Sequence, residues 1–110
     1  MKNLIGRTFT IIVDRPLGSA HPNYPEIIYP INYGYIPNMM APDGEEQDVY
    51  LLGVNVPIET FTGTIIAILN RADDVEDKLV MAPAGVDFTD AEILAQTHFQ
   101  EQYFKTALQR

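Results

Sequence analysis

Prolines interrupt the chain six times between Pro16 and Pro42, and this spacing constrains the fold more than any other feature of the sequence. Proline has no backbone N–H and disfavours helical backbone at the residue before it, so this stretch cannot propagate a helix. Four tyrosines lie among the prolines. Short extended pieces, such as residues 27–29, are therefore expected there.

Strand patterns occupy much of the chain on either side of this stretch. Residues 7–14 are rich in β-branched and aromatic side chains and are followed by a proline and a glycine, which are turn signals. Residues 49–54, 62–69 and 79–82 are apolar runs of strand length with turn residues at their ends. Several short strands in a small chain favour a barrel or a curled sheet over alternating βαβ units.

The C-terminal residues carry a helix pattern. Thr89 and Glu92 form a capping box, in which each side chain binds the backbone N–H of the other residue. Apolar residues then recur at i, i+4 spacing from Ala91 to Ala107, which predicts a helix over residues 90–109 whose apolar face closes one side of the barrel. The predicted fold is mainly β with a C-terminal helix.

Composition narrows the class of protein. A chain of 110 residues fits one domain, residues 1–110, because single cores commonly carry roughly 100 to 200 residues. An apolar fraction of 46% with 20% charged residues is typical of a soluble globular protein, and the absence of cysteine excludes disulfides and thiolate metal sites. The sequence shows neither a signal-peptide core nor an apolar run approaching the roughly 18 residues of a membrane span, so a cytoplasmic protein is expected.

The charge of the chain bears on its partners. The formal net charge is -8, and the seven Lys and Arg residues are scattered, which argues against nucleic-acid binding. An acidic chain can instead hold hard divalent cations such as Mg²⁺ through carboxylate oxygens. A bound metal would in turn admit a small anionic substrate.

Two acidic segments lie beside predicted strands. The first carries four carboxylates over residues 43–48, around a turn glycine, and the second spans residues 71–78. Taken alone, each segment is explained by a solvated surface turn. Two such loops at strand ends can also converge on one mouth of a small barrel, where about four or five oxygens would hold one or two Mg²⁺ ions.

Other side chains are candidates for contacts to an anion. Lys78 ends the second acidic segment, directly after its acidic residues, although a surface lysine at a strand start is the commoner situation. Tyr33 and Tyr103 could donate to phosphoryl oxygens or simply pack, and Arg15 is equally open. The two histidines are far apart and pair with no Ser or Cys in the sequence, so neither a triad hydrolase nor a zinc site is expected.

Several motifs, in order along the chain, resemble the soluble inorganic pyrophosphatases of the Mg²⁺-dependent, barrel-fold family. They are residues 13–19 (VDRPLGS), 29–36 (YPINYGYI), 43–49 (DGEEQDV), 73–78 (DDVEDK) and 98–103 (HFQEQY). The tyrosine-rich second motif is the most specific, and the similarity covers most of the chain. The resemblance implies a small closed five-stranded, OB-like barrel that hydrolyses pyrophosphate to two phosphates with several Mg²⁺ ions.

The resemblance also implies roles for particular residues. The implied metal ligands are Asp43, Asp48, Asp73 and Glu76. The implied substrate-binding residues are Arg15, Tyr33, Lys78 and Tyr103. The implied catalytic residues are Glu45, Asp48 and Lys78, with Glu45 at the position where the family has an aspartate that helps to deprotonate the attacking water.

The sequence departs from the family pattern at several positions. Glu45 is one methylene longer than the expected aspartate. Phe104 stands where a lysine usually follows the tyrosine, and Lys105 comes one place later, about 100° around the predicted helix. The family's lysine and glutamate on its second strand have no clear counterparts near residues 21–25.

Besides a structural subunit whose helix face of Phe99, Tyr103 and Phe104 docks a partner, two functions of the acidic site remain open on this basis. The first is Mg²⁺-dependent hydrolysis of pyrophosphate, or of a closely related phosphoanhydride, by metal-activated water. The alternative is a non-catalytic or altered-substrate module that binds metal or phosphate ligands on the same fold, which the scarcity of Lys and Arg favours. A small-molecule substrate is expected, without nucleic acid or membrane, and homo-oligomer formation is an option that the family often uses.

Overall fold

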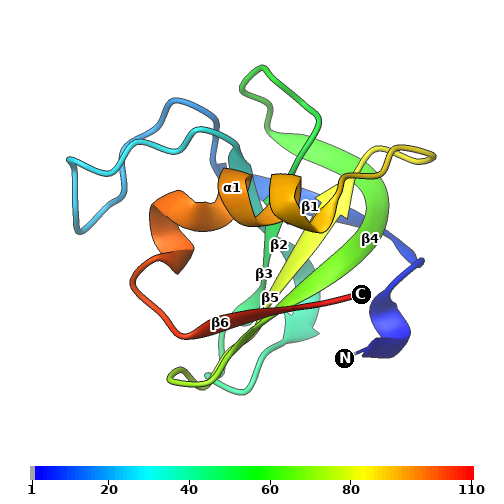
Figure 1. Cartoon of the computed structure of the whole chain (residues 1–110). Helices are drawn as coiled ribbons and strands as arrows, with labels where there is room; N and C mark the ends of the chain where they lie inside the picture. The colour runs from blue at the N-terminus through cyan, green and yellow to red at the C-terminus, as the bar shows by residue number, and fades with distance from the viewer. Residues whose placement is uncertain (1) are drawn as a thin grey trace.

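Five strands close into a barrel, and a helix and a sixth strand follow them in the chain. The computed structural model describes residues 2–110. The elements in order are the 3-10 helix η1 (Lys2–Leu4), β1 (Thr8–Arg15), β2 (Asn32–Met40), β3 (Glu46–Leu51), β4 (Thr60–Arg71), β5 (Lys78–Ala82), α1 (Asp90–Glu101) and β6 (Thr106–Gln109). Figure 1 shows α1 lying across one side of the barrel.

The strand order explains how the barrel closes. The sheet runs β1-β2-β3-β5-β4, and β1 pairs in turn with β4. Neighbouring strands are antiparallel except β3 and β5, which are parallel. The long strand β4 has three partners: residues 64–69 pair with β5, residues 60–64 pair with β1, and residues 68–71 pair with β6. The closed five-stranded barrel expected from the sequence is therefore confirmed.

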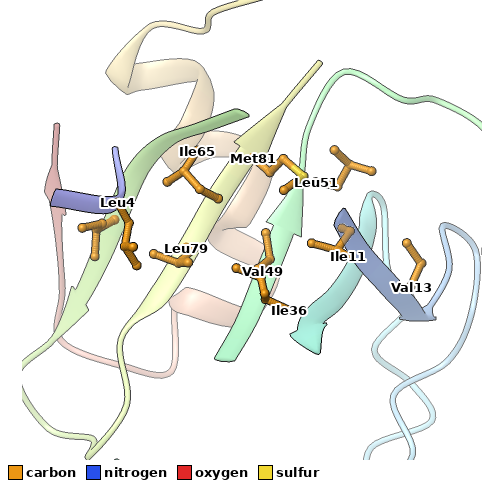
Figure 2. Close-up of a cluster of buried hydrophobic side chains, with 10 residues drawn as sticks. Leu4, Ile11, Val13, Ile36, Val49, Leu51, Ile65, Leu79 and Met81 are labelled. Carbon is orange, nitrogen blue, oxygen red and sulfur yellow. The ribbon is translucent and has the colours of Figure 1, made fainter. Parts of the chain in front are cut away.

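Alternation along the strands sorts the apolar side chains into two cores. The first fills the barrel (Figure 2) and consists of Leu4, Ile11, Val13, Ile36, Val49, Leu51, Ile65, Ile68, Leu79 and Met81. The second contains strand residues together with Ile93 of α1, and therefore lies between barrel and helix. Because neighbours on a strand point to opposite faces, Tyr50 belongs to the second core while Val49 and Leu51 belong to the first.

The predicted strands are present with shifted bounds, but β2 falls in the proline-rich stretch where only short extended pieces are expected. Pro37 is tolerated because it lies where the register between β2 and β3 shifts, between Tyr35 and Met40, so the ladder is already interrupted. Gly34 lets β2 approach β1 closely, since a Cβ at this position would overlap the backbone carbonyl of Ile12.

The predicted helix over residues 90–109 is too long. The capping box of Thr89 and Glu92 is present, but α1 ends at Glu101. Residues 106–109 form β6 instead, because the second half of β4 has an edge whose backbone groups need hydrogen-bond partners.

The buried face of α1 also differs from the prediction. Ile93, Thr97 and Gln100 are buried against the barrel, whereas Ala91 and Ala95 are exposed. Within residues 2–110 no helix has the length and apolar character that a bilayer crossing requires.

Candidate active site

A cavity of about 600 Å³ opens between the loop that follows β1 and the C-terminal end of α1, which lie on the same side of the molecule (Figure 1). Its lining residues are Arg15, His21, Tyr24, Glu26, Ile27, Tyr33, Asp48, Arg71, Lys78, Gln100, Tyr103 and Phe104. Tyr33, Arg71 and Lys78 are buried and form its floor, whereas Tyr24 and Tyr103 are exposed at its rim. The cavity therefore has a polar, buried end and an open aromatic end.

The parallel pairing of β3 with β5 brings Asp48 and Lys78 together. Val49 and Leu79 are register partners, and each directly follows one of the two charged residues. Lys78 Nζ lies 2.7 Å from Asp48 Oδ2 and 3.1 Å from Glu76 Oε1. With Lys78 only 6% exposed, a buried ammonium group is held between two carboxylates.

Glu76 also contacts the first acidic loop through Asp43. Burial, together with this hydrogen bond, raises the pKa of Glu76 to about 7 in spite of the Lys78 ammonium. The same hydrogen bond is the main reason that the pKa of Asp43 is lowered. The two acidic loops lie at the same end of the barrel, as Figure 1 shows.

The chemistry of these side chains fits a hard divalent cation. Carboxylate oxygens are the ligands that Mg²⁺ prefers. Lys78 joins the carboxylates of Asp48 and Glu76, and Asp43 interacts with Glu76 from the first acidic loop. In the part of the chain that the structure describes, no three acidic, His or Cys side chains are already grouped to hold an ion. Burial is the main cause of the raised pKa of Glu76, with Asp43 and Asp48 adding to it, and a bound cation would favour the ionised carboxylate against all three.

Asp73 and Glu45, the other two acidic residues predicted at the site, lie apart from Lys78 and its two carboxylate partners. Asp73 Oδ1 accepts a hydrogen bond from the backbone N–H of Lys105 at 2.8 Å, which fixes the turn before β6. Glu45 is exposed, and its backbone N–H donates to Asp43 Oδ1 at 2.9 Å. Among residues 2–110 no hydrogen bond or ion pair joins the side chain of Asp73 or Glu45 to Lys78.

Strand register also places Arg15 and Tyr33 together at the cavity. They are partners in the antiparallel pair of β1 and β2, and the guanidinium carbon of Arg15 lies 5.3 Å from the ring centre of Tyr33. Burial, followed by the negative charge of Asp48, raises the pKa of Tyr33 well above its usual value. The phenol therefore keeps its proton at neutral pH and can donate it in a hydrogen bond.

The turn after α1 places Tyr103 and Phe104 at the opposite side of the cavity. Tyr103 is 63% exposed, and the ring centre of Phe104 lies 3.7 Å from the guanidinium carbon of Arg71. The expected position of Lys105, about 100° around a helix, is wrong because the helix ends at Glu101. Lys105 is exposed and does not line the cavity, so the cation beside Phe104 is Arg71.

An ion pair that the sequence did not reveal lies beneath this cavity. Arg71 donates through Nε and a terminal nitrogen to the carboxylate of Glu101, which also accepts from Tyr50 Oη at 2.6 Å. The side chains of Arg71 and Glu101 are 3% and 5% exposed. Arg71 also contacts Asp74 at 3.0 Å, so it ties the second acidic loop to the end of α1.

The hydrogen bonds continue from this pair toward Arg15. Gln100 donates to Tyr50 Oη at 2.8 Å and accepts from Tyr29 Oη at 2.7 Å. Tyr29 in turn accepts a hydrogen bond from Arg15. A chain of polar side chains therefore connects the two arginines of the cavity through the last turn of α1.

Fold and site together define the chain as a five-stranded barrel with a flanking helix and a charged cavity. Solved structures share this architecture. The inorganic pyrophosphatase from Ehrlichia chaffeensis has a TM-score of 0.69 and 17% identity, with 93% of this chain and 84% of that chain covered. The inorganic pyrophosphatase from Coxiella burnetii has a TM-score of 0.67 and 20% identity, with 90% and 78% covered.

Sequence comparison assigns the family. The family model for inorganic pyrophosphatase matches residues 9–107, and the chain therefore belongs to this family. A search of curated protein sequences gave no significant match.

Proposed function

We propose that this chain is a Mg²⁺-dependent inorganic diphosphatase, which hydrolyses pyrophosphate to two phosphates. The observation that supports this most is the position of Lys78 between Asp48 and Glu76 on the floor of the cavity. A cation and two carboxylates at one buried point suit a dense anion that is bound through metal ions. Membership of the inorganic pyrophosphatase family supports the same reaction.

In this proposal Asp43, Asp48 and Glu76 hold the metal. Bound Mg²⁺ would cancel part of the substrate charge and lower the pKa of a coordinated water. The predicted ligand role of Asp73 would use Oδ2, because Oδ1 accepts the backbone N–H of Lys105.

In this proposal, side chains that donate hydrogen bonds position the substrate. The Lys78 ammonium lies where it can contact a phosphoryl oxygen once a cation engages the neighbouring carboxylates. Arg15 and Tyr33 offer a guanidinium and a protonated phenol from the adjacent wall, and Tyr103 offers a phenol from the rim. In-line phosphoryl transfer asks mainly for such positioning and charge stabilisation, so no nucleophilic side chain is required.

Glu45 is the proposed base for the attacking water. It sits on an exposed loop next to Asp43, and its extra methylene extends its reach from that loop. Because a displacement of about 1 Å can cost about 10²-fold in rate, Glu45→Gln and Glu45→Asp should both lower kcat. The glutamine variant should lose more, since it removes the base itself.

Phosphate release from pyrophosphate in Mg²⁺, with EDTA as the control, tests the proposal. Asp48→Ala should lower the rate at least about 100-fold, because it removes a ligand and a partner of Lys78. Glu59→Gln is the matched control, since Glu59 is exposed and outside the cavity lining, and its rate should equal that of the wild type. Saturable Mg²⁺ binding by calorimetry without any turnover would contradict the proposal and support a binding module.

A further inference from the structure

The cavity has more room than a pyrophosphate anion fills. Its volume of about 600 Å³ lies within the range of roughly 300 to 1,000 Å³ that is usual for pockets enclosing drug-sized ligands. Of the lining residues assigned to phosphate and metal, Arg15, Tyr33, Asp48 and Lys78 come from the strands β1, β2, β3 and β5, and Tyr103 lies at the rim. The remaining lining forms a rim with chemistry of its own.

Aromatic side chains form two sides of this rim. His21 and Tyr24 come from the loop after β1, and Tyr103 and Phe104 come from the turn after α1, which faces that loop in Figure 1. Tyr24 is 57% exposed, and its ring centre lies 5.2 Å from that of His21. Exposed aromatic rings are stacking surfaces for a planar ligand, and a bare diphosphate has no group that uses them.

The charges on the rim also do not suit a bare anion. Burial, followed by the charge of Arg15, lowers the pKa of His21, so its imidazole is neutral at pH 7 and offers a ring instead of a charge. Glu26 is exposed and, among residues 2–110, takes part in no ion pair. A carboxylate repels phosphate but accepts hydrogen bonds from sugar hydroxyls, as acidic residues do for ribose in dinucleotide sites.

We propose that the site also hydrolyses a nucleoside 5′-diphosphate, with its phosphates beside Lys78 and Arg15, its ribose near Glu26 and its base stacked at Tyr24. This rests on the proposed function, because the same floor performs the chemistry. Water attacks the terminal phosphorus, and the bond from that phosphorus to the bridging oxygen breaks with its electron pair left on the oxygen. The products are a nucleoside monophosphate, orthophosphate and one proton.

ADP and pyrophosphate are the probes that test this inference. Phosphate release is measured with both substrates in Mg²⁺ for the wild type, Tyr24→Leu and Ile28→Ala. Ile28 is the matched control, because it is exposed in the same loop but does not line the cavity. Tyr24→Leu should raise KM for ADP about tenfold, the loss expected for one base–aromatic stack, and leave KM for pyrophosphate unchanged. Ile28→Ala should change neither.

A second measurement is independent of turnover. With Ca²⁺ present as a non-reactive cation, saturation-transfer difference NMR with ADP should show saturation of the adenine protons, and Tyr24→Leu should reduce it several-fold relative to Ile28→Ala. An adenine signal that is equal in both variants would overturn the placement of the base at the rim.

The two substrates separate the two proposals. Hydrolysis of pyrophosphate without hydrolysis of ADP overturns this inference and leaves the proposed function intact. Hydrolysis of ADP without hydrolysis of pyrophosphate supports this inference and overturns the proposed function. Absence of both overturns both, and an equal rise in KM for the two substrates in Tyr24→Leu overturns the role of Tyr24.

Discussion

Replacing Glu101 by glutamine tests the buried ion pair that joins the second acidic loop to α1. Glutamine preserves the shape of the side chain but cannot balance the guanidinium of Arg71, which is 3% exposed in its side chain. The arginine would then be left as a charge largely removed from water. Such a charge is far more costly than a missing neutral hydrogen bond.

The size of the effect follows from the burial of the pair. Removing one partner of a buried ion pair typically costs about 3 to 5 kcal/mol. Asp74 still contacts Arg71 at 3.0 Å, but its side chain is 29% exposed, so it compensates for only part of the loss. We expect a cost near the lower end, about 3 kcal/mol, which corresponds to a fall in Tm of roughly 12 °C for a domain of this length.

Thermal unfolding followed by circular dichroism measures this change. The double variant Arg71→Met/Glu101→Gln should melt higher than Glu101→Gln, because it leaves no unpaired charge in the interior. Asp87→Asn is the surface control, since Asp87 pairs with Arg110 while 69% exposed and should contribute less than about 1 kcal/mol. A Glu101→Gln protein that melts within about 3 °C of the wild type would refute the reasoning, as would a double variant that melts below the single one.

The ion pair of Arg71 and Glu101 also predicts how the stability of the fold depends on pH. Burial by itself would raise the pKa of Glu101, but hydrogen bonds from Arg71, Tyr50 and Thr106 outweigh it and leave the pKa below the ordinary value. A carboxyl group with a lowered pKa stabilises the fold above its unfolded pKa of about 4.3, and this contribution is lost as pH falls through the folded value. The difference in Tm between wild type and Glu101→Gln should therefore be constant near neutral pH and shrink below about pH 4. A difference that does not shrink as the pH is lowered from about 4 would count against the pair.

Three further predictions concern other parts of the chain. Gly34→Ala should lower Tm by at least about 10 °C or prevent folding, because its Cβ would overlap the Ile12 carbonyl; a melting curve like that of the wild type would contradict this. In EDTA, Glu76→Gln should be more stable than the wild type above about pH 7 and lose this advantage below about pH 5, because the raised pKa makes ionised Glu76 unfavourable in the fold; parallel pH profiles would argue against it. Tyr29→Phe removes the phenol that binds Arg15, so KM for pyrophosphate should rise about fivefold with little change in kcat, and an unchanged KM would speak against Arg15 as a substrate contact.

The parts of the fold that local patterns dictate could be predicted from the sequence. The strands near residues 7–14, 62–69 and 79–82 and the capping box of Thr89 follow from side-chain type and short-range spacing. The segment 106–109 could not be predicted in this way, because its apolar residues fit a helix face as well as a short strand. The free edge of β4 decides between the two, and that edge is distant in the sequence.

The candidate site, like the fold, could be predicted from the sequence only in part. The acidic loops, Lys78 and the tyrosine-rich motif could be identified from residue type and family resemblance. Their mutual contacts depend on the parallel register of β3 with β5, which no local pattern encodes. Arg71 and Glu101 could not be recognised as a buried pair, since in the sequence each looks like an ordinary surface charge at the end of an element.

The charge balance of the cavity makes substrate binding depend on a metal. Arg71 is neutralised by Glu101 and Asp74, and the Lys78 ammonium already lies between two carboxylates. Among the lining residues this leaves Arg15 as the cation without a carboxylate in direct contact, which is little to hold a dense anion in a chain of net charge -8. Pyrophosphate should therefore bind at least about 100-fold more weakly in EDTA than with Ca²⁺ present as a non-reactive cation, as calorimetry would show. Equal affinity in the two conditions would mean that the protein's own cations hold the substrate, and the role given to the acidic loops would be wrong.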